Sequence, residues 1–518
     1  MEAHGLATRT AGNAIFSLVG FAWPAALAVV SMPYIVHRLG NDAYGILTLV
    51  MSVLGYFAFL DLGITNAVTK YVAEYHAQSR RDLINQVVGV ALVAFLLLGC
   101  VGAALLAGFT AFLVPRLLKI PPGLLPVARF AFYVASAGFM VNMVMGVIAA
   151  IPNALQRYDL SARVGMAFAT ITVAGTVALL AAGYGLREIV LLNLAASIGS
   201  LSVYALMARR LLPSISFRPR AHWQAFRRLL SFGVLSSMSG LFSSTTYQFD
   251  RLFIGALLGT GAVTFYVVPV TLARVIAAVT GRLATVLFPL ASELSSTGQP
   301  ERLRDIYLRS SRFIVVINTA LAVPLIGLAY PTLRFWMGPS FADAGAVVMV
   351  LIVAAYYLTA LTVVPAYVVG GMGHPGITAV FSWITAILNL SLLFPLIRAY
   401  GIVGAAWSCL ISVSHSPLDI IYVNRRVIKV SSWQLFRCSY AGPLAAGAVA
   451  LAVARLIVAQ HVHSLPVLAA AFAGLFAFYF ALVLACGGLD RDDRRILRQA
   501  VSALPARLGR RPSATALP

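Results

Sequence analysis

Long apolar stretches separated by short polar segments run along almost the whole chain. About fourteen of them reach the roughly 20 residues that an α-helix needs to cross a bilayer. Their approximate limits are 11–36, 43–69, 86–114, 126–151, 161–183, 188–208, 229–258, 260–290, 311–333, 344–371, 376–398, 402–424, 440–462 and 465–487. The connecting segments are too short for a folded globular domain. The pattern predicts an all-α polytopic membrane protein with about fourteen transmembrane helices.

The composition supports this class and excludes others. Of the 518 residues, 60% are hydrophobic and only 10% are charged, against about 25% charged in soluble proteins. The net charge of +22 does not indicate nucleic-acid binding, because most arginines punctuate apolar stretches and do not form one basic domain. The four cysteines have no paired spacing, so we predict neither a disulfide framework nor a zinc site. We also find no nucleotide-binding loop and no nucleophile–base arrangement, and we expect no enzyme.

The distribution of Lys and Arg predicts the orientation in the membrane. If the N-terminus lies inside, 27 of the 38 Lys and Arg residues fall in cytoplasmic segments, 7 in outside segments and 4 within the membrane. Cytoplasmic loops carry the excess of positive charge in membrane proteins. We therefore expect both termini on the cytoplasmic side.

The longest and most basic inside loop, residues 209–228, divides the chain into six spans and eight. A faint internal repeat agrees with this division, since Leu39-Gly40 recurs as Leu258-Gly259, and residues 72–84 resemble residues 291–306. Parallel repeats are typical of transporters, with the substrate site at the repeat interface. We predict an N-terminal lobe (1–212), a basic linker (213–228), a C-terminal lobe (229–424), a helix pair (425–489) and a partly disordered cytoplasmic tail (490–518).

Charged and polar side chains form stripes on three of the predicted helices. At about 100° per residue, the stripe on segment 263–290 contains Thr264, Thr271, Arg274, Ala278, Arg282 and Thr285. The stripe on the preceding segment contains Ser236, Gly240, Ser243, Tyr247 and Asp250, and that on the first helix contains Asn13, Ser17, Gly20, Pro24 and Ser31. A charge at mid-bilayer costs a few kcal/mol and usually faces a cavity or a partner. The stripes predict a water-lined, positively charged chamber, although the small residues of the first helix fit close helix packing equally well.

Several motifs occur in a characteristic order. The first hairpin contains an LG-x-x-x-YG turn, FLDLGI and TKYVAE, and later segments read FDRLFIGALLGTGAVTFY, VLFPLASEL and DRDDRRIL. Together they resemble the polysaccharide (O-antigen type) flippases of the multidrug/oligosaccharidyl-lipid/polysaccharide exporter superfamily. The resemblance covers nearly the whole length.

This resemblance implies a specific activity. Such proteins move undecaprenyl-pyrophosphate-linked sugar units from the cytoplasmic to the periplasmic leaflet of the bacterial inner membrane. They have two six-helix lobes and a final helix pair. The expected partners are the lipid-linked oligosaccharide, membrane lipids, polysaccharide polymerase machinery and a coupling ion, with no cofactor, metal or nucleic acid.

Arginine suits a chamber that must hold a pyrophosphate, because guanidinium stays charged and binds phosphate oxygens in pairs. Arg274 is the strongest candidate, about 18 Å from the outer end of its helix, and its alternative role is an ion pair with Asp250. Arg282 lies nearer the cytoplasm and could instead snorkel to the interface. Asp250 and Arg251 point about 100° apart, so they either bind ligand or latch the two lobes together.

Two further charged residues have open roles. Asp61 points away from the polar stripe of its own helix, so either that helix breaks at Gly63 or Asp61 pairs with a third helix. A buried carboxylate could also be the coupling protonation site. Lys70 is a candidate substrate contact, but a cytoplasmic anchor is the more usual role of a lysine at this position.

Three other functions compete with the flippase interpretation. A drug/cation antiporter of the same superfamily would more naturally carry acidic residues in its chamber. Here the predicted spans contain four arginines and only three aspartates. A flippase for lipid-linked peptidoglycan precursors is poorly separated by sequence. A membrane glycosyl polymerase or ligase needs a large outside loop with catalytic groups, and no outside loop exceeds about 15 residues.

Overall fold

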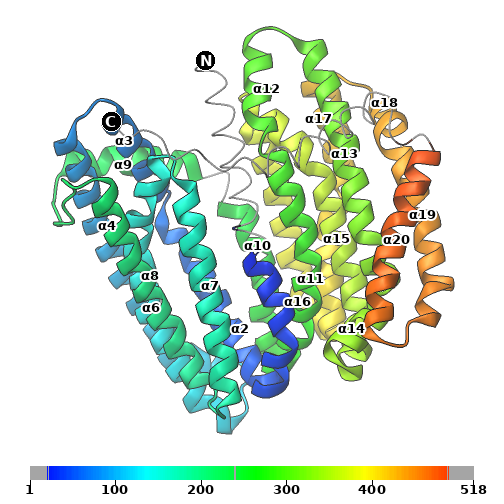
Figure 1. Cartoon of the computed structure of the whole chain (residues 1–518), viewed down its shortest axis with the longest axis horizontal. Helices are drawn as coiled ribbons and strands as arrows, with labels where there is room; N and C mark the ends of the chain where they lie inside the picture. The colour runs from blue at the N-terminus through cyan, green and yellow to red at the C-terminus, as the bar shows by residue number, and fades with distance from the viewer. Residues whose placement is uncertain (1–19, 21–22, 238–240, 487, 489–518) are drawn as a thin grey trace, which may run out of the picture. The chain divides into compact units, whose positions relative to one another are not determined.

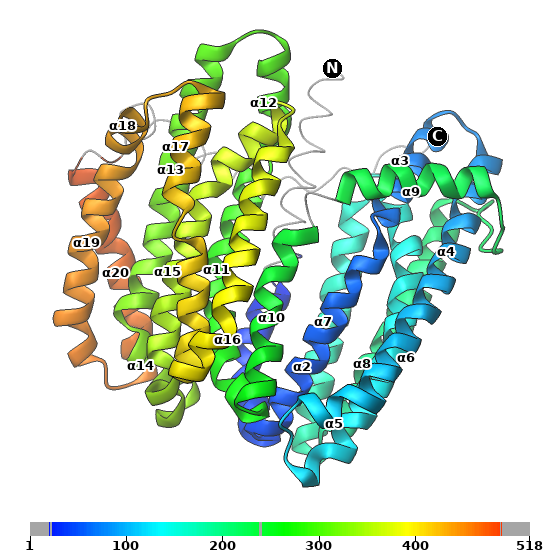
Figure 2. The ribbon, with the colours of Figure 1, turned by 180° about the vertical axis from the view of Figure 1, so that it is seen from behind.

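The structure is a computed structural model, all-helical over the residues it describes (Figures 1 and 2). It describes residues 20, 23–237, 241–486 and 488, with the side chains of residues 58 and 234–248 excepted. Residues 23–39 are helical. The helices that follow are α2 (Asn41–Phe57), α3 (Ile64–Ala77), α4 (Arg81–Gly108), α5 (Val114–Leu117), α6 (Leu125–Ala154), α7 (Tyr158–Ala181), α8 (Leu186–Leu211), α9 (Trp223–Ser237), α10 (Leu241–Leu257), α11 (Thr260–Ala284), α12 (Leu287–Ser296), α13 (Pro300–Gly327), α14 (Ala329–Met337), α15 (Pro339–Gly371), α16 (Pro375–Val413), α17 (Ser416–Val423), α18 (Ser432–Leu435), α19 (Ala441–Leu456) and α20 (Leu465–Ala485).

Within the described residues, eleven helical stretches are long and apolar enough to cross a membrane. The prediction of an all-α polytopic membrane protein is therefore confirmed at this level. The count of fourteen differs for identifiable reasons. The predicted spans at 11–36 and 229–258 include residues outside the described part, and two further predicted spans belong to one 54-residue stretch, Pro375–Ile428. That stretch turns at Gly401, whose φ of 61° and ψ of −139° are not helical.

The described residues group into two compact units. The first contains the described residues up to Arg274 with Trp336–Ala355 and Pro375–Ser414. The second contains Val275–Phe335, Tyr356–His374 and the described residues from His415 onward. Each unit has its own apolar packing. Tyr71, Phe95 and Ile151 belong to a core of the first unit, and Val316 and Tyr479 to one of the second.

Residues with a left-handed backbone conformation recur at a regular spacing along the chain, which supports the internal duplication. Four of the six positive-φ residues described before the linker have counterparts 217 to 219 residues later, in the pairs Gly40 and Gly259, Ser79 and Gly298, Gln156 and Gly373, and Gly183 and Gly401. The hydrogen bonds at one pair of helix ends also match. Arg80 N donates to Tyr75 O at 2.9 Å, and Gln299 N donates to Leu294 O at 3.0 Å. Both are the bond that closes a helix C-terminus with a left-handed residue.

The predicted basic linker packs against α4 in the first unit. The side-chain amide of Asn85 donates to Ser214 O at 3.1 Å and accepts from Ser216 N at 2.8 Å. Further along, Arg220 N donates to Gly89 O at 3.2 Å. A Cβ at Gly89 would lie 2.8 Å from Arg218 O, so only glycine allows the linker this close. Residues 213–222 thus form an ordered strap over the start of α4, whereas the rest of the predicted linker belongs to the start of α9.

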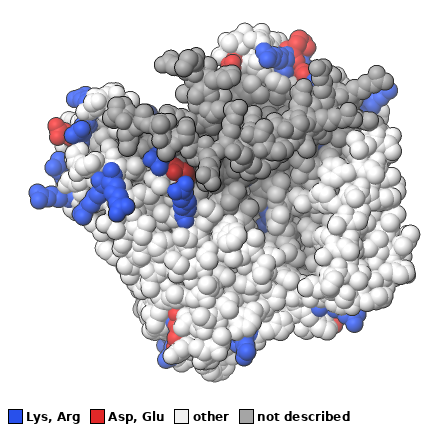
Figure 3. All heavy atoms as spheres, in the orientation of Figure 1, with Lys and Arg blue, Asp and Glu red and all other residues white. Residues whose placement is uncertain are grey.

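Charged side chains are sparse along the middles of the described helices. On the face shown in Figure 3, Lys and Arg gather near the ends of helices, and the helix surfaces between them carry other residues. This is the distribution that a membrane environment requires, because a charge at mid-bilayer is costly.

Candidate functional site

Arg274 lies in the middle of α11 and is exposed. It stands fourteen residues after Thr260, about 21 Å along the helix at 1.5 Å per residue. Within the described residues its guanidinium has no hydrogen-bond or ion-pair partner, and the alternative ion pair with Asp250 is not formed there. A charged side chain at this depth therefore has its binding capacity available for a polar ligand.

Asp250 is held instead by a tyrosine of the next helix. Its side chain is 1% exposed, and Oδ2 accepts a hydrogen bond of 2.6 Å from the Tyr266 hydroxyl. Its other oxygen, Oδ1, has no hydrogen-bond partner among the described residues. A buried carboxylate is stable only when it is paired or hydrogen-bonded. The contact joins α10 to α11.

Arg251 points to a different neighbour, as its position next to Asp250 requires. The half-buried guanidinium donates from Nη1 to Ser52 Oγ of α2 at 3.2 Å. In Figures 1 and 2, α2 and α10 lie side by side. Asp250 and Arg251 therefore fix α10 to two helices, one from each half of the chain.

The two repeated LG turns contact each other where α2 and α11 begin. Thr260 Oγ1 donates to Asp42 Oδ1, and Thr264 Oγ1 donates to Asn41 O at 2.7 Å. The backbones are so close that a Cβ at Gly45 would lie 1.9 Å from Thr260 O. The starts of α2 and α11 are thus held together by backbone approach and side-chain hydrogen bonds.

Asp61 caps a helix. The chain breaks after a short 3-10 turn, with Leu62 at φ 48° and Gly63 at φ 72°, and α3 then begins at Ile64. Asp61 Oδ1 accepts a hydrogen bond of 3.0 Å from Thr65 N, one of the unpaired amides of the first helical turn. Of the two alternatives for this residue, the structure has the break at Gly63.

The other candidate side chains lie in simpler surroundings. Lys70 is exposed, and its Nζ lies 4.3 Å from the centre of the Phe232 ring and 4.6 Å from that of Tyr71, a cation–π contact between α3 and α9. The Thr271 hydroxyl donates to Val267 O of its own helix at 2.9 Å. Arg282 is exposed and interacts with other groups of the protein.

One expectation about α11 is wrong. The sequence pattern predicts a polar stripe along a single helix to residue 290, but α11 ends at Ala284 and a turn separates it from α12. Thr285 lies in that turn, where its hydroxyl donates to Arg282 O at 2.8 Å. It therefore does not continue the helical stripe.

A cavity of about 460 Å³ lies within the first unit, and Pro24 lines it. Its other lining residues come from α2, α6, α7 and α8 and include Asn142, Thr172, Asn193 and Ser197. The remaining residues proposed to line a cavity, Asn13, Ser17 and the side chain of Tyr247, lie outside the described part of the chain. The structure therefore brings Pro24 to a cavity with polar groups in its wall.

Sequence reasoning missed the partners that hold Asp250 and Arg251. In the sequence, Tyr266 follows the second LG pair as Tyr44 follows the first, and Ser52 is one of several polar residues of its helix. Asp250 and Tyr266 are sixteen residues apart on two different helices, so no short-range periodicity could reveal their contact. The only sequence signal for this contact was the presence of a polar residue on each of two adjacent apolar spans.

Comparison with known proteins identifies the family. A family model described as "Polysaccharide biosynthesis protein" matches residues 11–295, more than half of the chain. The chain belongs to the polysaccharide biosynthesis protein family. The resemblance drawn from the sequence motifs is thereby confirmed, as is the prediction of a membrane transporter of polysaccharide biosynthesis rather than an enzyme.

Two relatives of this family member align over most of their length. The "Uncharacterized membrane protein EpsK" of Bacillus subtilis (strain 168) is 25% identical over 93% of this chain and 96% of its own. A Shigella flexneri protein named "Putative O-antigen transporter" is 22% identical over 81% of this chain and 98% of its own.

Solved structures show which fold the family member has. The lipid II flippase MurJ, in an inward closed conformation, aligns with a TM-score of 0.65 at 11% identity, covering 91% of this chain and 98% of that one. An inward-facing multidrug resistance MATE family transporter of the MOP superfamily aligns with a TM-score of 0.63 at 14% identity, covering 80% and 99%. At such identities the likeness establishes a MATE/MurJ-like fold and no shared substrate.

Proposed function

We propose that this protein is a flippase that moves polyprenyl-pyrophosphate-linked oligosaccharide repeat units across the cytoplasmic membrane. Transport proceeds by alternating access through a cationic central cavity. The observation that carries the proposal is Arg274, an exposed guanidinium in the middle of a membrane-spanning helix with no partner among the described residues. Membership of the polysaccharide biosynthesis family, and the name of the Shigella flexneri relative, support this substrate class.

The chemistry of the substrate fits an arginine at this depth. A pyrophosphate must pass the hydrocarbon region while its polyprenyl tail stays in lipid, and a guanidinium replaces the lost water with paired, charge-assisted hydrogen bonds. Arg282, two turns further along α11, is proposed to extend the same positive face. We assign Lys70, next to the aromatic rings of Tyr71 and Phe232, to the cytoplasmic entrance.

The cavity lined by Pro24 suits the sugar part. Its wall combines the amides of Asn142 and Asn193 and the hydroxyls of Thr172 and Ser197 with apolar surface. Amides and hydroxyls are donors and acceptors without charge, so they can bind sugar hydroxyls of different repeat units. We propose that this part of the N-terminal lobe receives the glycan.

The proposed architecture has fourteen spans with both termini in the cytoplasm, in the bacterial inner membrane. Residues 23–39 form part of the first span, α10 belongs to the seventh, and Gly401 separates two spans within the stretch Pro375–Ile428. These additions to the eleven described candidates give two six-helix lobes, 1–212 and 229–424, and a final pair in 425–489. The linker 213–228 joins the lobes.

Asp250 and Arg251 are proposed to latch α10 to its neighbours in one state of the cycle. Their hydrogen bonds to Tyr266 and Ser52 tie helices from both halves of the chain. Movement of α2 away from α10 would break the hydrogen bond between Arg251 and Ser52, at a cost in free energy. A ligand or coupling ion that compensates this cost would then bias the transition.

A flippase for lipid-linked peptidoglycan precursors remains the second candidate, because its substrate carries the same diphosphate on a lipid and the lipid II flippase shares the fold. A drug/cation antiporter of the superfamily is disfavoured by the excess of arginine over aspartate in the spans.

Deletion of the gene tests the function. If the protein is this flippase, we expect the polyprenyl-linked oligosaccharide to accumulate on the cytoplasmic leaflet of the deletion strain. A membrane-impermeant lectin should then reach it only in inside-out vesicles. Normal surface polysaccharide with accumulation of peptidoglycan precursor would favour the second candidate instead. Unchanged levels of both lipids would contradict both.

A further inference from the structure

A second cavity lies at the predicted cytoplasmic side of the first unit, away from Arg274. It has a volume of about 270 Å³ and is open to the surface between the α3–α4 turn and the strap formed by the linker. Its wall includes His76, Ser79 and Arg81 on one side and Leu211, Leu212 and Ser214 on the other. We propose that this cavity binds the phosphate-bearing headgroup of an anionic membrane lipid.

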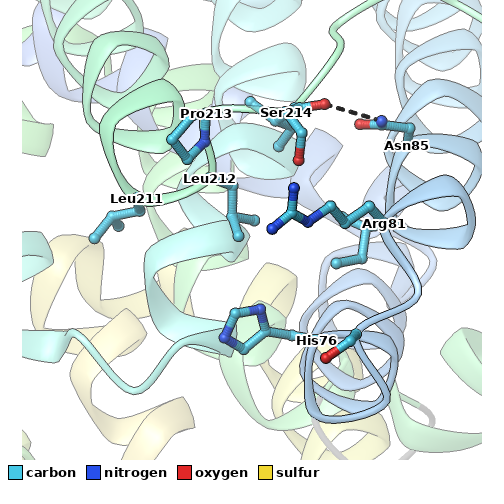
Figure 4. A pocket seen from close by; sticks show the side chains of 10 residues that line it. His76, Arg81, Asn85, Leu211, Leu212, Pro213 and Ser214 are labelled. Atoms are coloured by element: carbon cyan, nitrogen blue, oxygen red, sulfur yellow. Dashed lines mark hydrogen bonds between the residues drawn. The ribbon is translucent and has the colours of Figure 1, made fainter. Parts of the chain in front are cut away.

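The wall of the cavity is a built structure and not a gap between loose loops. Asn85 fixes the strap through two hydrogen bonds, one to Ser214 O, which Figure 4 shows, and one from Ser216 N. On the other side, the left-handed Ser79, with φ of 57°, turns the chain between α3 and α4 and places Arg81 at the first position of α4. Both walls are thus held in place by hydrogen-bonded backbone.

The side chains that face the cavity provide donors for a phosphate. In Figure 4 the Arg81 guanidinium extends from α4 toward Leu212 and Ser214, and the His76 ring points into the same space. Among the described residues neither side chain has a hydrogen-bond or ion-pair partner, and no carboxylate lines the cavity. An arginine can bind two phosphate oxygens at once, and the imidazole adds a further donor.

The apolar part of the wall points to a lipid as the source of the phosphate. Ile84, Leu211 and Leu212 line the cavity, at the ends of the candidate spans Arg81–Leu117 and Leu186–Leu211. The cavity therefore lies where a headgroup meets the first carbons of its chains. Arg80, Arg209 and Arg210 lie close by in sequence, and basic pockets between helices on the cytoplasmic side attract anionic headgroups.

Arg81→Gln tests the site, with Arg80→Gln as the matched control. Both substitutions remove one exposed arginine from the same turn, but only Arg81 lines the cavity. Phosphatidylglycerol bound to the full chain is titrated by native mass spectrometry against phosphatidylcholine. Because a hydrogen bond to a charged group is worth enough for about a tenfold change, we expect affinity for the most tightly bound phosphatidylglycerol to fall about tenfold in R81Q and less than about twofold in R80Q.

The outcomes separate a specific lipid site from general attraction to a basic surface and from a site for soluble phosphate. Equal losses in the two variants would indicate general attraction and would overturn the proposal. Millimolar inorganic phosphate serves as a second arm, and we expect it to leave the bound phosphatidylglycerol in place. If inorganic phosphate displaces the lipid fully in the wild type but not in R81Q, the cavity is a site for a soluble phosphate and the lipid assignment is wrong. Equal thermal unfolding of all three proteins in phosphatidylcholine verifies that R81Q is folded.

Discussion

Single residues in the spans divide into those held by the protein and those left available. Asp250 and Arg251 are adjacent, and the 100° between neighbouring helical positions sends one to Tyr266 and the other to Ser52. The divergence of the pair followed from the sequence. Their partners could not be predicted, since they depend on which helices pack together and at what register. Arg274 has no such partner among the described residues, and for this reason we propose that Arg274 binds the ligand.

The Asp250–Arg251 latch predicts non-additive effects of substitution. Asp250→Asn weakens the bond from Tyr266, and Arg251→Gln removes the cation bound to Ser52. If the two side chains share one network, the unfolding free energies of the single and double variants should differ from additivity by about 0.5–3 kcal/mol. Unfolding of the purified proteins in detergent measures the cycle. Strictly additive losses would assign the two contacts to independent roles.

At the scale of helices and turns, the repeated sequence motifs adopt the same backbone conformation in both halves of the chain. The LG pairs at 39–40 and 258–259 place glycine at positive φ, which glycine adopts without the steric cost that other residues have. The two turns then lie against each other through Asp42 and Thr260. The repeat was visible in the sequence, but the contact between its copies was not, because it depends on tertiary packing.

Substitutions of Asp61 can distinguish two roles of this residue. A hydrogen bond to the start of α3 and a role in proton coupling predict different effects of the same substitution. An asparagine oxygen can accept the same bond from Thr65 N, whereas alanine cannot, and loss of a side-chain bond to a first-turn amide costs about 0.5–2 kcal/mol at N-cap positions. We therefore expect Asp61→Asn to keep both stability and polysaccharide export and Asp61→Ala to lower stability by that amount. Thermal unfolding and export in a deletion strain provide the two readouts. Loss of export in D61N with unchanged stability would instead make Asp61 a protonation site.

At the scale of the whole molecule, apolar length and charge distribution predicted the class of protein well. Stretches of about 20 apolar residues must be helical in a bilayer, since every backbone group has to be hydrogen-bonded within its segment. The boundaries were less predictable where polar residues break a helix. The break at Leu62–Gly63 and the turn after Ala284 both interrupt runs that are apolar enough to resemble single spans. The ordered linker was likewise hidden, because a basic, proline-containing loop carries no periodic signal.

Flipping by the reconstituted protein tests the central assignment of a cationic transport path most directly. Vesicles carry the purified chain and a polyprenyl-pyrophosphate-linked oligosaccharide with a fluorescent label, and a membrane-impermeant quencher reports which leaflet holds it. We expect that the wild type and Arg455→Gln, which changes an exposed arginine in the last turn of α19, equilibrate the lipid across the bilayer. We expect Arg274→Ala to stay at the protein-free rate, a loss of at least about tenfold for a charged contact. Flipping by R274A at the wild-type rate would contradict the assignment.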